Sequence, residues 1–150
     1  MDWLPIAIVF IVAVLGFVFT SIGMGGYQKL NKPCYAPPGG AIGVVWIIIY
    51  IFIAWAWMQL RAVADEQFVT TINWLFGINL LANLAWSFIF FTAGDVPGAM
   101  WLLAVLLLTT AQIAALAVQA NQVVPAYLLA IYLLWLTNAT WLNFKITQIN

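Results

Sequence analysis

The chain has 150 residues, of which 67% are hydrophobic and 5% are charged, with four basic residues against four acidic ones. This composition predicts a membrane protein and excludes the basic surface that a nucleic-acid partner needs. Histidine is absent, which removes the commonest metal ligand and general base, and the single cysteine excludes an internal disulfide.

Five stretches are apolar enough to cross a bilayer, which takes about 20 residues each. We therefore predict one transmembrane domain over residues 1–150, an all-α integral membrane bundle of five helices. Short connections between most of the helices favour antiparallel neighbours, and we expect the helices to be unbroken. The predicted spans are residues 3–24, 41–60, 67–92, 98–120 and 123–145.

Residues 25–40, with the sequence GGYQKLNKPCYAPPGG, form the first connection and are predicted to be an ordered lid loop. Pro37 and Pro38 favour a stiff extended segment, followed by a turn at the two glycines. Lys29 and Lys32 have two interpretations that the sequence leaves open. They either signal topology or pair with ligand carboxylates at the membrane surface.

Charge also predicts orientation. With five spans, the lid and the C-terminal end share one side of the membrane, which carries Lys29, Lys32 and Lys145, whereas the other side carries Arg61. Because cytoplasmic loops are enriched in Lys and Arg, we expect the lid and the C-terminus to face the cytoplasm.

The predicted spans contain no ionisable residue at mid-depth and no recognisable catalytic or metal-binding motif. Aromatic and amide stripes are what remains. In the third span, Asn79, Asn83 and Trp86 recur on one helical face, and an asparagine in hydrocarbon needs a partner, so we expect both amides to face the interior. Interhelical hydrogen bonding and pocket lining remain equally open for them.

Similar stripes occur in the second span, at Trp46 and Tyr50, and in the fifth, at Tyr132, Trp135 and Ala139. If these faces converge beneath the lid, they form a flat apolar slot with a few hydrogen-bond donors. Such a slot suits a planar hydrophobic ligand.

In order along the chain, these residues resemble the translocator protein family, also called the tryptophan-rich sensory proteins (TspO/MBR). The resemblance covers nearly the whole chain. It rests on Tyr27, Leu30, Lys32-Pro33 and Pro37-Pro38 in the lid, Trp46 and Tyr50, then Asn83, Trp86, Phe90 and Phe91, and finally Tyr132-Leu133, Trp135, Ala139-Thr140 and Leu142-Asn143.

The resemblance implies a receptor or carrier that binds tetrapyrroles such as protoporphyrin IX, in sensing, transport or homeostasis of porphyrins. It also implies sterols or benzodiazepine-type compounds as further ligands, a homodimer and no required cofactor or metal. The chain departs from the family at Gly26 and Tyr35, where tryptophan is usual, and at Phe144, where the sterol motif needs tyrosine, so sterol binding through that motif is not expected.

Two other functions stay open. One is light- and oxygen-dependent porphyrin degradation that uses Trp46 and Trp135, and the other is a non-catalytic membrane scaffold. For the binding function, the predicted ligand-binding residues are Tyr27, Lys29, Lys32, Pro37, Pro38, Trp46, Tyr50, Asn83, Trp86, Tyr132, Trp135 and Ala139.

Overall fold

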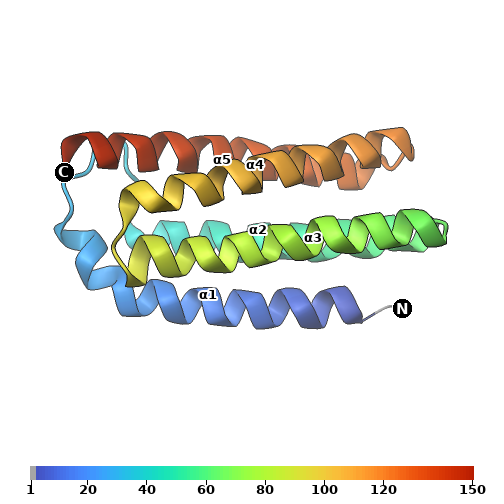
Figure 1. The fold of residues 1–150 in the computed structure, drawn as a ribbon, viewed down its shortest axis with the longest axis horizontal. Coiled ribbons are helices and arrows are strands. Elements are labelled where there is room, and N and C mark those ends of the chain that lie inside the picture. Colours follow the sequence, from blue (N-terminus) through green and yellow to red (C-terminus); the bar gives the residue numbers. More distant parts are fainter. Residues whose placement is uncertain (1–2) are drawn as a thin grey trace.

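The computed structural model describes residues 3–150, and this part of the chain is an all-α bundle (Figure 1). Five helices are long and apolar enough to cross a membrane, which confirms the predicted fold class. They are α1 (Leu4–Lys29), α2 (Gly39–Val63), α3 (Glu66–Ser87) with its π-helical continuation η1 (Phe88–Thr92), α4 (Val96–Gln119) and α5 (Val123–Ile149).

The lid is shorter than the sequence predicts. Helix α1 continues through the two glycines to Lys29, and α2 already begins at Gly39, so only residues 30–38 lie outside the helices. The proline after Lys32 favours an extended backbone at the residue before it, which sets a limit to α1. The prediction that residues 25–29 belong to the loop was therefore wrong, as was the turn expected at Gly39-Gly40.

Helix α1 lies on one side of the bundle, α4 and α5 lie on the other, and α2 and α3 lie between them (Figure 1). The connections follow the up-and-down order expected from the short loops. The lid, the connection between η1 and α4, and the end of α5 all lie at one end of the bundle. This arrangement places Lys29, Lys32 and Lys145 at that end and Arg61 at the other.

The helix starts at Glu66 and Val96 have clear sequence causes. Asp65 accepts a hydrogen bond from the Phe68 amide at 2.8 Å, and Asp95 accepts one from the Gly98 amide at 2.9 Å. Each carboxylate thereby satisfies a backbone donor that the first helical turn leaves unpaired.

A hydrogen-bonded chain of polar side chains joins four helices inside the bundle. Tyr50 of α2 donates to Asn83 Oδ1 at 2.6 Å, and Asn83 Nδ2 donates to the Tyr132 hydroxyl of α5 at 3.4 Å. Tyr132 donates in turn to Asn79 Oδ1 at 3.2 Å, and Asn79 Nδ2 donates to Thr109 Oγ1 of α4 at 2.7 Å. Both asparagines are buried, as predicted, because hydrocarbon offers them no partner.

Helix α1 approaches η1 more closely than any bulky side chain would allow. A Cβ on Gly23 would overlap the Phe91 carbonyl group and lie 2.8 Å from Phe91 Cα. The Thr92 hydroxyl donates to the Phe19 carbonyl of α1 at 2.9 Å beside this contact. The π-helical turn corrects the expectation of an unbroken third span, and its wider turn shifts the side chains that follow it, which include two rings of the site described next.

Candidate functional site: an aromatic cavity beneath the lid

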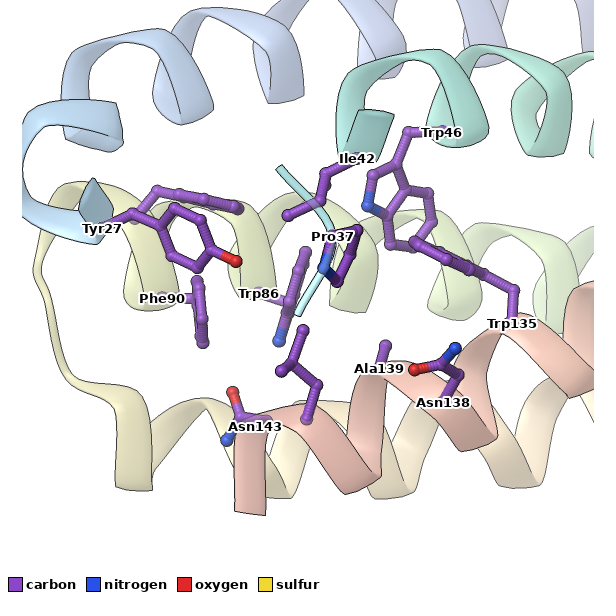
Figure 2. A pocket seen from close by; sticks show the side chains of 12 residues that line it. Tyr27, Pro37, Ile42, Trp46, Trp86, Phe90, Trp135, Asn138, Ala139 and Asn143 are labelled. Carbon is purple, nitrogen blue, oxygen red and sulfur yellow. The ribbon is translucent and has the colours of Figure 1, made fainter. Parts of the chain in front are cut away.

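A cavity of about 20 Å³ lies between the lid and helices α1, α2, α3 with η1, and α5 (Figure 2). This volume holds about one water molecule, so the side chains nearly fill the site in this closed state. Its lining is almost wholly apolar and aromatic. The lining residues are Tyr27, Pro37, Ile42, Trp46, Trp86, Phe90, Phe91, Trp135, Asn138, Ala139, Leu142 and Asn143.

The walls are aromatic rings that pack on one another. The Trp46 ring centroid lies 5.7 Å from that of Trp86 and 6.3 Å from that of Trp135. On the opposite wall, the Trp86 ring stacks on Phe90 at 5.1 Å, and Tyr27 lies 5.5 Å from Phe91. These flat, rigid groups form a slot with apolar faces, which is the shape that a planar ring system complements.

The polar atoms at this cavity are unusual because they lack partners. Four buried side-chain atoms in residues 3–150 make no hydrogen bond: the Tyr27 hydroxyl, Nε1 of Trp86, Nε1 of Trp135 and Oδ1 of Asn143. All four belong to residues that line this cavity. A buried polar group without a partner costs about 1–3 kcal/mol. Their convergence on one void therefore indicates a place where a ligand supplies the missing partners.

Lys32 holds the lid against the end of α1. Its Nζ donates to the carbonyls of Tyr27, Gln28 and Leu30 at 2.8, 3.1 and 2.8 Å. The same ammonium lies 4.8 Å from the centroid of the Tyr27 ring. An ammonium has three protons to donate, and carbonyls at a helix C-terminus attract a cation, so this lysine acts here as a helix cap.

A second attachment joins the lid to the end of α5. Asn150 Oδ1 accepts from the Asn31 amide at 2.9 Å, and Asn150 Nδ2 donates to the Asn31 carbonyl at 2.9 Å. This reciprocal pair resembles one rung of a sheet. It fixes the lid over the cavity through two hydrogen bonds.

The structure brings six of the predicted residues together around the cavity and separates the other six from it. Those on the lining are Tyr27, Pro37, Trp46, Trp86, Trp135 and Ala139. Pro38 and Lys29 are exposed at the lid end. Lys32 caps α1, whereas Tyr50, Asn83 and Tyr132 belong to the hydrogen-bonded chain behind Trp46.

Six lining residues are absent from the sequence-based prediction: Ile42, Phe90, Phe91, Asn138, Leu142 and Asn143. Three of them continue the α5 stripe, since Asn138, Leu142 and Asn143 follow Trp135 at helical spacing. Extending that stripe by two turns would have found them. Phe90 and Phe91 face the cavity together because of the π-helical turn, for which the sequence gives no clear signal.

No group of three or more Cys, Asp or Glu residues that could hold a metal ion occurs in residues 3–150. The fold and the cavity define a multi-pass membrane protein with an aromatic pocket at one end of a five-helix bundle. The chain belongs to the TspO/MBR family, whose pattern matches residues 5–149.

Curated relatives agree with this assignment. The chain is 34% identical to the translocator protein of Homo sapiens over 85% of this chain and 76% of the relative. It is 32% identical to the translocator protein of Sus scrofa over 99% and 91% of the two chains. It is also 32% identical to the tryptophan-rich protein TspO of Chlorobaculum tepidum, over 83% and 78%.

Proposed function

We propose that this protein binds a tetrapyrrole of the protoporphyrin IX type in the aromatic cavity beneath the lid, in sensing, transport or homeostasis of porphyrins. The convergence of four unpartnered polar atoms on an otherwise apolar slot is the single observation that supports this most strongly. A porphyrin offers large apolar faces to the indoles, and nitrogen and carboxylate groups to the donors. Sterols and benzodiazepine-type compounds are further candidate ligands.

Binding requires the cavity to open, because about 20 Å³ is far less than a porphyrin occupies. The closed state is then the ligand-free one, and the ligand selects a wider arrangement of the rings and the lid. Part of the binding free energy is spent on this rearrangement. Variants that favour the open state should therefore bind more tightly.

The charged residues fit this function at the membrane surface. Lys29 is exposed at the lid end of the bundle, so it is free to attract a propionate without disturbing the fold. Lys32 would have to leave the carbonyls that it caps. We propose that Lys29 contacts the ligand carboxylates, that the lid end faces the cytoplasm and that the protein forms a homodimer.

Equilibrium binding to single-donor variants tests the proposal. Tyr27→Phe, Trp86→Phe and Trp135→Phe each remove one unpartnered donor while keeping a ring. Each should weaken protoporphyrin IX binding about threefold to tenfold, which is the loss of one hydrogen bond. The shift of the porphyrin absorption band provides the readout, since it does not depend on tryptophan emission.

The matched control is Trp101→Phe, on a residue of α4 that is 80% exposed and does not line the cavity. Its affinity should equal that of the unchanged protein. If all four variants bind alike, the cavity is not the porphyrin site. If the unchanged protein shows no saturable binding, the scaffold function replaces the present proposal.

A photochemical activity is a second candidate, and the indole packing favours it. Trp46 lies within 6.3 Å of Trp86 and of Trp135, measured between ring centroids, so an excited ligand in the slot would face several oxidisable rings. Illumination of the porphyrin complex with and without oxygen tests this. Unchanged breakdown in the Trp46→Phe/Trp135→Phe double variant would exclude these two indoles from the reaction.

A further inference from the structure

Two further voids lie between α1 and α2 and lead outward from the aromatic cavity. The first, here called the middle cavity, measures about 60 Å³. It is lined by Ala13, Gly16, Phe17, Thr20, Ile42, Gly43, Trp46, Ile47, Tyr50 and Ser87. The second, here called the outer groove, measures about 400 Å³ and is lined by Ile6, Val9, Phe10, Ala13, Val14, Phe17, Ile47, Tyr50, Ile51 and Ala54.

The three voids are continuous in their lining. The aromatic cavity and the middle cavity share Ile42 and Trp46, which therefore form the wall between them. The middle cavity and the outer groove share Ala13, Phe17 and two residues of α2. Figure 2 shows Ile42 and Trp46 projecting from the same stretch of α2 toward the aromatic cavity. Two side chains, and no backbone segment, thus close the inner wall.

The outer groove opens toward the hydrocarbon of the bilayer. Phe10 and Phe17 are each 67% exposed, and Ile47 is 60% exposed. In a spanning helix such apolar surface faces acyl chains. The middle cavity is framed by small residues, Ala13 and Gly16 of α1 and Gly43 of α2, which leave a window between the two helices.

The lid offers a more difficult route than this window. Opening it breaks the two Asn31–Asn150 hydrogen bonds, and its three prolines limit the conformations it can adopt. The window needs only new rotamers of Ile42 and Trp46. Trp46 is half-buried, and therefore less confined than the buried Trp86.

We propose that the α1–α2 window is a lateral portal through which the porphyrin-class ligand passes from the bilayer into the aromatic cavity, with Ile42 and Trp46 as its gate. This inference rests on the proposed function, since it concerns access to the same cavity. The portal admits uncharged or weakly charged planar molecules dissolved in the membrane. It makes the membrane, rather than the aqueous phase, the immediate source of ligand.

Kinetics separate the portal from the binding site. Gly43 lines the middle cavity but not the aromatic cavity, and a Cβ there meets no atom within 4 Å. Gly43→Leu should therefore fit the fold and obstruct the window. A path residue that does not touch the bound ligand changes both rates equally and leaves Kd unchanged. We expect association and dissociation to slow at least about tenfold, the effect of overfilling a packed space.

The measurement is stopped-flow binding of protoporphyrin IX dimethyl ester, supplied in phosphatidylcholine vesicles, to the full chain in nanodiscs of the same lipid. Gly77→Leu of α3 is the matched control, because a Cβ there is equally unobstructed and the residue lines none of the three voids. It should leave both rates unchanged.

A second variant makes the opposite change without touching the core. Phe17→Ala truncates a mostly exposed side chain that lines the middle cavity and the outer groove, so both rates should rise at least about threefold. Leu134→Ala, on a residue of α5 that is 72% exposed, is its control and should have no effect. Phe17→Ala keeps the portal testable if Gly43→Leu fails to fold.

Asn150→Ala tests the alternative route, because it removes the side chain that fastens the lid. Slower exchange in Gly43→Leu, faster exchange in Phe17→Ala and unchanged exchange in Asn150→Ala support the portal. Faster exchange in Asn150→Ala with unchanged rates in both window variants overturns it and assigns access to the lid. A changed Kd with unchanged association in Gly43→Leu also overturns it. Absence of saturable binding in the unchanged protein overturns the proposed function itself.

Discussion

Replacement of Gly23 by alanine tests the contact between α1 and η1 on which one wall of the cavity depends. The new Cβ would lie 2.8 Å from Phe91 Cα and would overlap the carbonyl group of the same residue. An ordinary contact between carbon atoms is about 3.5 Å, so the two segments must separate by at least about 0.7 Å. No flexible side chain end is available to move instead, because the obstacle is backbone.

The magnitude follows from two contributions. Overpacking of this kind costs about 1–3 kcal/mol. Separation also weakens the 2.9 Å hydrogen bond from Thr92 to the Phe19 carbonyl, and such a bond in a membrane contributes about 0.6 kcal/mol. Gly25→Ala is the matched control, because a Cβ there meets no atom within 4 Å and alanine gains about 1 kcal/mol of helix propensity at either site.

We therefore expect Gly23→Ala to be less stable than Gly25→Ala by about 2–4 kcal/mol. The free energy of unfolding is measured by titrating each variant with sodium dodecyl sulfate in mixed micelles, with circular dichroism as the readout. Porphyrin affinity should also fall in Gly23→Ala, because Phe91 lines the cavity. Equal stability of the two variants would refute the close approach of α1 to η1.

Further predictions concern the cap, the interior hydrogen bonds and the unpartnered donors. Lys32→Met removes three bonds to carbonyls, so amide hydrogen exchange in residues 30–36 should rise while exchange in the α4 core stays constant. Asn79→Leu breaks bonds to α4 and α5 and should lower the free energy of unfolding by about 1–2 kcal/mol in the same titration, whereas Thr70→Val on an exposed face should not. Trp135→Phe removes a buried donor without a partner, so ligand-free stability should stay equal or rise while porphyrin affinity falls; a fall in both would make that indole a structural residue.

The architecture of the membrane-spanning part could be predicted because it depends on composition and period. Apolar runs of sufficient length have one stable arrangement in hydrocarbon, in which every backbone group is bonded within the helix. Asn79 and Asn83 had to face the interior for the same reason. The stripe through Trp135 and Ala139 gave the right face of α5, since residues at helical spacing share a side whatever surrounds them.

The roles of single polar residues depended on distances that the sequence does not contain. Lys32 bonds to three carbonyls because α1 ends within reach of its side chain, and Tyr50, Asn83 and Tyr132 bond to one another because three helices meet behind the cavity. These residues are satisfied by the protein. Tyr27 and three other residues of the cavity are not, and nothing in residue type separates the two groups.

The amino-acid sequence by itself determined that this chain spans a membrane five times, which face each helix turns inward and where the lid is attached. Only the tertiary structure decided which inward polar atoms remain without partners, that η1 takes a π-helical turn against Gly23, and that a window opens between α1 and α2. The physical reason is that burial follows from local composition, whereas hydrogen-bond satisfaction and free space depend on how separate helices fit together.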